Sequence, residues 1–138
     1  MQPITVSIQV NAPIQRVWKL WNTPEDIRKW NNVSEDWHTP SAENDLRPGG
    51  KLKLVMGLKD GSFSFDFNAT YNQVKTHELI SYTLSDGRHS TITYTGSNPV
   101  TIAETFEPNA TDPLDMQTDF CSAVLASFKK YAESQEEQ

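Results

Sequence analysis

The segment 62–71 alternates between apolar and polar side chains at every position. Its apolar positions hold Phe63, Phe65, Phe67, Ala69 and Tyr71. A period of two puts all of them on one face of a β-strand and leaves hydroxyl, amide and carboxyl groups on the other. A strand with one aromatic face is stable only where that face packs against a second layer. The segment therefore predicts an antiparallel sheet that is covered on one side and hydrated on the other.

The same alternation recurs along the chain. It is regular in the first segment, where the apolar positions are Ile4, Val6, Ile8 and Val10. Later segments give the inward-facing sets Leu52/Leu54/Met56, Ile80/Tyr82/Leu84, Ile92/Tyr94 and Val100/Ile102/Phe106. Turn sequences separate these segments at residues 47–50, 60–61, 86–87 and 96–99. Strands joined by such short turns pair antiparallel, so the chain after residue 35 is predicted to form a meander of hairpins.

Two short helices are predicted between the first strand and this meander. The first carries one helical stripe, made of Ile14, Val17, Trp18 and Trp21. We expect Asn11 to be its N-cap, because an asparagine side chain accepts hydrogen bonds from the first amides of a helix. The second helix begins at Thr23-Pro24, with threonine as the cap and proline at the first helical position.

A long helix is predicted at the C-terminal end. Asp112-Pro113 marks its start, and its apolar stripe consists of Met116, Phe120, Val124 and Phe128. The only large apolar surface available to this stripe is the aromatic face of the sheet. We therefore predict an α+β fold in which a curved, antiparallel, seven-stranded sheet wraps around one long C-terminal helix.

Composition limits the class of protein. The chain has 138 residues, 12 basic and 18 acidic, and a net charge of −6, which disfavours nucleic acid as a partner. The longest apolar run, Ala123-Val124-Leu125-Ala126, is far too short for a membrane span. The first residues, Met1-Gln2-Pro3-Ile4, lack the pattern of a secretory signal, and Cys121 is the single cysteine. We therefore expect a cytoplasmic protein without internal disulfides.

The inward aromatic side chains are numerous enough to line a pocket. With one carboxyl and one aliphatic group, the candidate lining is Trp30, Trp37, Phe65, Phe67, Tyr82, Tyr94, Glu104, Phe106, Phe120, Val124 and Phe128. Several of these rings end in a polar group that would orient a ligand. The alternative is that the same side chains fill the core and leave no space.

Glu104 is the most informative single residue. It occupies the inward phase of its strand, between Ile102 and Phe106 on an apolar face. A buried carboxyl must be paired or must have a raised pKa. It would then anchor a ligand hydroxyl or amine, or act as a general base. The alternative is a structural role, in which Glu104 pairs with a neighbouring Arg, His or Tyr or is turned outward by a bulge.

The histidines do not predict a metal site. His38, His77 and His89 do not stand at metal-ligand spacing to one another or to Cys121, and we expect neither a metal nor another cofactor. No hydrolase motif is present. His38, next to Trp37, would lie at the mouth of the pocket. The alternative is that His38 is a solvated strand residue.

The order of elements and several short motifs resemble a known family. The motifs are Trp37-His38-Thr39-Pro40, the turn 44–50, Asp60-Gly61-Ser62-Phe63, Glu104-Thr105-Phe106-Glu107-Pro108 and Phe128-Lys129-Lys130-Tyr131. The chain is similar to the helix-grip fold of the START-like (SRPBCC) superfamily, and its motifs resemble the branch named after the activator of heat-shock-protein-90 ATPase. The resemblance implies one START-like domain over residues 1–138 and a ligand cavity between sheet and terminal helix.

Three functions follow as hypotheses. We favour a module that binds a small apolar or aromatic molecule without converting it, because inward rings and one inward carboxyl converge. The second is an enzyme of cyclase or hydratase type, in which Glu104, with His38 or Tyr82, moves a proton on the ligand. The third is a co-chaperone-like interaction module that uses an exposed sheet face or the surface of Lys51 and Lys53. In the resembled branch, co-chaperone activity belongs to longer proteins with an additional N-terminal domain, which argues against a chaperone partner. The sequence specifies no oligomeric state.

Overall fold

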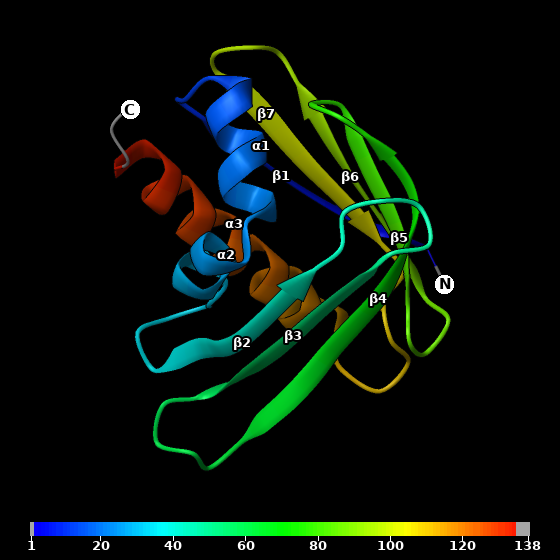
Figure 1. Ribbon diagram of the computed structural model, residues 1–138. Coiled ribbons are helices and arrows are strands. Elements are labelled where there is room, and N and C mark those ends of the chain that lie inside the picture. The colour runs from blue at the N-terminus through cyan, green and yellow to red at the C-terminus, as the bar shows by residue number, and fades with distance from the viewer. Residues whose placement is uncertain (1, 135–138) are drawn as a thin grey trace.

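The computed structural model describes residues 2–134 (Figure 1). Its strands are β1 (Ile4–Val10), β2 (Trp37–Asn44), β3 (Lys51–Leu58), β4 (Ser64–Lys75), β5 (Leu79–Leu84), β6 (His89–Thr95) and β7 (Val100–Phe106). Its helices are α1 (Ile14–Asn22), α2 (Pro24–Trp30) and α3 (Leu114–Ser134). All strands form one sheet in the order β1-β7-β6-β5-β4-β3-β2, with every neighbouring pair antiparallel. The predicted seven-stranded sheet, long terminal helix and two short intervening helices are confirmed.

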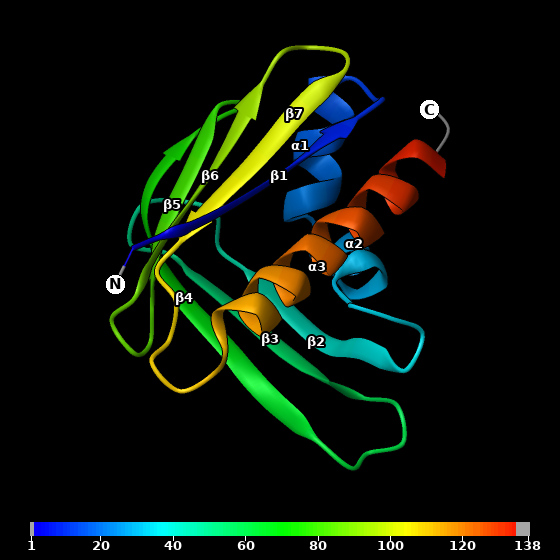
Figure 2. The same ribbon diagram turned by 180° about the vertical axis from the view of Figure 1, so that it is seen from behind.

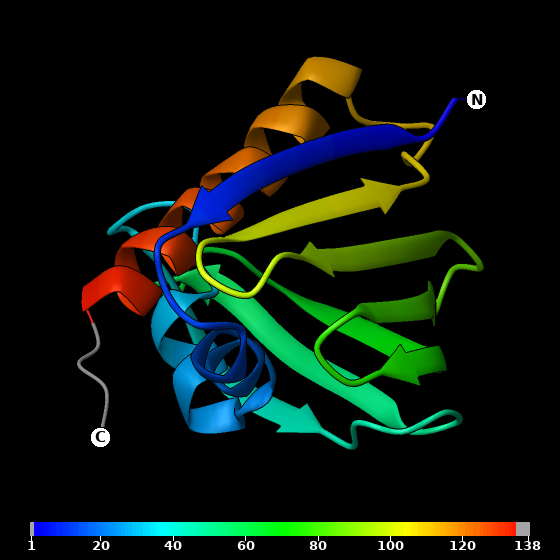
Figure 3. The same cartoon turned by 90° about the horizontal axis from the view of Figure 1, so that it is seen from above.

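The sheet is bent around the helices on its concave side. Figures 1 and 2 show α3 crossing this side, with β1 along one flank and β2 near the other. Helix α3 packs against β1, and α2 packs against β2, so both edge strands of the sheet are next to a helix. In the view from above, α1, α2 and the C-terminal half of α3 gather at one end, while the N-terminal half of α3 extends toward the other (Figure 3).

The packed core lies at the end where the three helices meet. Phe128 of α3 is fully buried, and its ring centroid lies 4.9 Å from the rings of both Trp21 and Trp30. The Trp30 indole nitrogen donates a hydrogen bond of 2.9 Å to the Leu20 carbonyl, which satisfies its only polar atom. The Tyr131 hydroxyl reaches Oδ1 of Asp26 at 2.6 Å and ties α3 to α2.

The alternation in residues 62–71 holds over most of its length. Phe65, Phe67, Ala69 and Tyr71 all face the concave side, and burial increases along β4 toward Tyr71. Phe63 lies before the strand and is 53% exposed. The aromatic face thus begins at the surface and runs into the interior.

Of the two predicted helix caps, Asn11 is wrong, whereas Thr23 is at the N-cap of α2 without the side-chain hydrogen bond of a cap. Asn11 does not cap α1, because the helix begins at Ile14 after Pro13. The backbone N–H of Asn11 donates a hydrogen bond of 2.8 Å to Oε2 of Glu133 on α3. Thr23 precedes α2 as expected, but its hydroxyl donates to the Lys19 carbonyl of the preceding helix at 2.7 Å. The two helices are so close in sequence that the end of α1 competes for this side chain.

Candidate functional site

A pocket of about 690 Å³ lies between the concave face of the sheet and the N-terminal half of α3. The pocket exists because α1 and α2 cover only one half of α3. Along α3, the fully buried apolar residues are Leu125, Phe128 and Ala132, all in the half that α1 and α2 cover. The preceding turns carry Phe120 and Val124, which are only half-buried and face the pocket.

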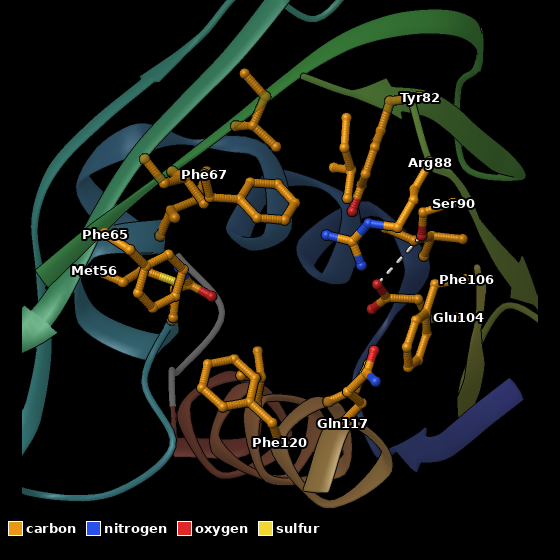
Figure 4. A pocket seen from close by; sticks show the side chains of 18 of the residues that line it. Met56, Phe65, Phe67, Tyr82, Arg88, Ser90, Glu104, Phe106, Gln117 and Phe120 are labelled. Carbon is orange, nitrogen blue, oxygen red and sulfur yellow. Dashed lines mark hydrogen bonds between the residues drawn. The ribbon is translucent and has the colours of Figure 1, made fainter. Parts of the chain in front are cut away.

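One wall of the pocket is apolar. Met56 from β3, Phe65 and Phe67 from β4, and Phe120 from α3 point toward the same space (Figure 4). The rings of Phe65 and Phe120 lie 6.5 Å apart, and the Phe67 ring meets Tyr82 edge-on at 6.1 Å. Because these rings retain exposed surface, an apolar guest would remove that surface from water.

The same wall continues into an aromatic rim. The Trp37 ring contacts Phe63, Phe65 and Phe120 edge-on, at centroid distances of 6.0, 6.3 and 6.2 Å. Phe63 and Met116 line the pocket and are 53% and 52% exposed. The pocket therefore opens between the β3–β4 hairpin and the start of α3.

The facing wall is polar. Glu104 from β7, Ser90 from β6, Tyr82 from β5 and Arg88 from the β5–β6 turn project into the pocket opposite the phenylalanines (Figure 4). The Ser90 hydroxyl donates a hydrogen bond of 3.4 Å to Oε2 of Glu104. Within the part of the chain that the structure describes, Glu104 forms no ion pair.

Burial raises the pKa of Glu104 above its ordinary value of 4.5. The Cys121 thiol and the Ser90 hydroxyl favour the charged form as hydrogen-bond donors, but they offset burial only in part. Some of the Glu104 surface stays uncovered because it faces the pocket. Burial and the nearby carboxylate also raise the pKa of the Cys121 thiol, so this cysteine is a neutral wall residue, not a nucleophile.

The other two side chains of the polar wall are Arg88, which is bound to partners within the protein, and Tyr82, which is buried. The Arg88 guanidinium is paired with Asp86 at 2.8 Å, and its Nη1 donates to the Glu107 carbonyl at 3.4 Å. Burial and the Glu104 charge keep the pKa of Tyr82 well above its usual range, so its hydroxyl remains protonated.

A chain of hydrogen bonds joins three other residues that line the pocket. The Tyr71 hydroxyl donates to Oδ1 of Asn44 at 2.6 Å. The Asn44 amide in turn donates to the Asn22 carbonyl at 2.8 Å. This chain links β4, β2 and the end of α1, and it fixes the orientation of the tyrosine.

The structure brings most of the sequence-predicted lining together. The pocket is lined by Trp30, Trp37, Phe65, Phe67, Tyr82, Glu104, Phe106, Phe120 and Val124. Tyr94 and Phe128 lie in the packed core instead. Tyr94 packs edge-on against Trp18 at 5.2 Å, and Phe128 is enclosed by the two tryptophans described above.

His38 does not line the pocket. Its neighbours Trp37 and Thr39 face the helices, since Trp37 meets Phe120 of α3 and the Thr39 hydroxyl bonds the Asn31 carbonyl after α2. The alternation of a strand turns His38 to the opposite side. The structure therefore places His38 outside the pocket that Glu104 lines, contrary to its expected position at the pocket mouth.

Sequence reasoning missed part of the polar wall. Ser90 shares the period of Ile92 and Tyr94, so extending that alternation by one position would have found it. Arg88 lies in a turn and has no periodic signal. Gln117 of α3 lines the pocket but uses its side chain to hold the preceding loop, accepting from the Asn109 amide at 2.9 Å.

Two further observations concern the described residues 2–134. Their helices include none that is long and apolar enough to cross a membrane. Their His, Cys, Asp and Glu side chains form no group of three placed to hold a metal ion.

Comparison with known proteins connects this geometry to a family. The family described as activator of Hsp90 ATPase homolog 1-like protein matches residues 11–133. The solution structure of an AHSA1-like protein from Aeromonas hydrophila is 30% identical, with a TM-score of 0.85, and the match covers 98% of this chain and 99% of that one. A protein from Cytophaga hutchinsonii is 44% identical, with a TM-score of 0.82 and coverage of 98% and 97%.

A more distant likeness shows the fold alone. The Aha1 dimer from Colwellia psychrerythraea is 14% identical, with a TM-score of 0.77, over 99% of this chain and 100% of that one. None of the curated proteins compared with the chain matches it.

Proposed function

The chain belongs to the family of activator of Hsp90 ATPase homolog 1-like proteins, within the START-like superfamily, and from this premise we propose that it binds a small apolar or aromatic molecule between its sheet and α3. The observation that carries the proposal is the pocket, in which an apolar wall of half-covered rings faces the largely buried carboxyl of Glu104, which forms no ion pair among the described residues. Residues 1–138 act as one domain in this proposal. Its place is the cytoplasm, where a lone reduced cysteine is ordinary.

The size and chemistry of the pocket support this function. Its volume of about 690 Å³ is typical of small-molecule sites, which are mostly apolar with a few placed polar groups. Burying about 250 Å² of apolar ligand surface at ~25 cal/mol per Å² would contribute about 6 kcal/mol before the costs of association. We therefore expect affinities in the micromolar range or weaker.

Two measurements test the proposal. Native mass spectrometry of the purified protein looks for a co-purifying molecule, and titration with the solvatochromic dye Nile red looks for an accessible apolar site. We expect a saturable blue shift of the dye that is lost in Val124→Phe, where the larger side chain enters the pocket. Wild-type protein that takes up neither dye nor any other guest would overturn the proposal.

A second candidate is an enzyme of cyclase or hydratase type. It is favoured by one observation, the raised pKa of Glu104 beside the protonated hydroxyl of Tyr82, since such carboxyls serve as general acids or bases. Once a substrate is identified, Glu104→Gln should keep substrate binding and lose turnover. Unchanged turnover would remove Glu104 from any mechanism and leave binding as the function.

The family's description refers to activation of the Hsp90 ATPase, and the same activity is a further candidate for this chain. Stimulation of the ATPase of a purified Hsp90 tests it directly. We place it behind small-molecule binding, because the pocket is a feature of this structure that a chaperone-contacting surface does not require.

A further inference from the structure

We propose that the pocket selects ligands that join an aromatic or apolar group to a protonated amine, with the Glu104 carboxylate as the counter-ion of that amine. The inference rests on the proposed binding function and adds the chemical class of the ligand. Its starting point is the arrangement of charge around the pocket.

Most of the charged groups at the pocket are already partnered within the protein. Arg88 pairs with Asp86. The carboxylate of Glu107 accepts from the amide and from Nδ1 of His89, at 2.6 and 2.8 Å. Asp112 accepts from the Asn109 side chain at 3.1 Å.

Glu104 differs from these groups because its carboxyl is largely buried and has neither an ion pair nor a short hydrogen bond among the described residues. The Ser90 hydroxyl at 3.4 Å and the weakly donating thiol of Cys121 are the donors that reach its carboxylate. A carboxylate has room for about four hydrogen bonds, so most of this capacity faces the pocket. The Arg88 guanidinium lies on the same wall (Figure 4), but it is paired with Asp86 and with the Glu107 carbonyl, and among the described residues no salt bridge joins it to Glu104.

An ammonium group satisfies this site better than the other common ligand groups. It carries several donors and the opposite charge, and an ionic hydrogen bond is about twice as strong as a neutral one. Aromatic rings, whose faces attract cations, line the same pocket, among them Phe67 and Tyr82. A ligand carboxylate would bring a second negative charge beside Glu104 in a chain whose net charge is −6.

The titration of Glu104 can be distinguished from that of the groups that face it. Tyr82 from β5 and Cys121 from α3 both have raised pKa values and stay neutral, and Arg88 from the β5–β6 turn is paired with Asp86. Its register neighbours, Val6 on β1 and Ile92 on β6, are apolar. Because burial raises the pKa of Glu104 above its ordinary value of 4.5, its carboxyl takes up a proton at a higher pH than an exposed glutamate does.

The test compares naphthylethylamine, naphthylethanol and naphthylacetate, which share one ring system and differ in the charge of the end group. Binding is followed by calorimetry and by displacement of Nile red. We expect the amine to bind at least about tenfold more tightly than the alcohol, and the carboxylate to bind most weakly. The amine stays protonated below about pH 8, so its affinity should fall on acidification as Glu104 takes up a proton, while the affinity of the alcohol stays constant.

Two variants localise the effect. Glu104→Gln keeps the shape of the side chain and should abolish the preference for the amine over the alcohol. Glu43→Gln changes net charge equally at an exposed position on β2 and should leave the preference intact.

The outcomes separate this inference from the proposed function. Nile red binding together with no amine preference, or a preference that survives in Glu104→Gln, overturns the inference and leaves small-molecule binding in place. A protein that binds neither Nile red nor any naphthyl probe overturns both.

Discussion

Ser90 and Glu104 lie on neighbouring strands and are joined by a hydrogen bond of 3.4 Å from the Ser90 hydroxyl to Oε2 of Glu104. The pair is diagonal, because Glu104 stands directly opposite Ile92 in the register of β6 and β7. The bond is long for an ionised acceptor, so it compensates little of the cost of burying the carboxylate. The polar wall of the pocket therefore carries an energetic cost.

The first prediction concerns the pH dependence of stability. The pKa of Glu104 is raised in the folded state above its ordinary value of 4.5, so the folded state binds more protons between the two values. The contribution of Glu104 to the free energy of unfolding is therefore complete below its pKa in the unfolded chain. It is lost as the pH rises through its pKa in the folded state. Glu104→Gln has no carboxyl to titrate at this position. As the pH is raised from about 4 to about 7, the free energy of unfolding of the variant should therefore rise relative to that of the wild type. Urea unfolding at both pH values measures this, and a constant difference would contradict the prediction.

The second prediction uses two neighbouring residues of α3. Val124 is half-buried and faces the pocket, whereas Leu125 is 1% exposed and packed. Val124→Phe should fill empty space and change the free energy of unfolding by less than about 1 kcal/mol. Leu125→Phe should overpack the core and cost about 1–3 kcal/mol. Equal destabilisation of the two variants would show that the space beside Val124 is already filled.

The third prediction compares two buried tyrosine hydroxyls. Tyr71 donates to Asn44 at 2.6 Å, while the Tyr94 hydroxyl is buried and has no hydrogen-bond partner. Tyr71→Phe leaves the Asn44 oxygen without its donor and should cost about 1–2 kcal/mol. Tyr94→Phe removes an unsatisfied group and should be neutral or stabilising by up to about 1 kcal/mol. Thermal and urea denaturation distinguish the two, and a loss in Tyr94→Phe as large as in Tyr71→Phe would contradict the assignment.

The fourth prediction compares two phenylalanines on the same stripe of α3. Phe128→Ala opens a cavity between Trp21 and Trp30 and should cost about 3–5 kcal/mol. Phe120→Ala shortens a half-exposed side chain at the pocket and should cost under about 2 kcal/mol, while it weakens binding of Nile red. Stability and dye binding are measured on the same samples. If Phe120→Ala lost as much stability as Phe128→Ala, the N-terminal half of α3 would be packed as tightly as its C-terminal half.

The sequence predicted the fold well because its signals are local. Alternation over residues 62–71 and in the shorter segments identified the strands, and the four-residue spacing from Met116 to Phe128 identified α3. The same alternation placed Glu104 on the inner face of β7. Helix caps were less predictable, since α1 begins two residues later than expected, after Pro13, and the Thr23 hydroxyl bonds the preceding helix.

What the sequence determined by itself is which side chains share a face, because a period of two or of about four residues is a property of the local backbone. Only the tertiary structure decided which parts of that face are covered. Phe120 and Phe128 occupy equivalent positions on one helical stripe, yet α1 and α2 enclose only the second. The turn that brings Arg88 to the pocket and the side of β2 on which His38 lies are likewise set by how the sheet bends and pairs. Coverage depends on where distant elements pack, and no short segment of the chain contains that information.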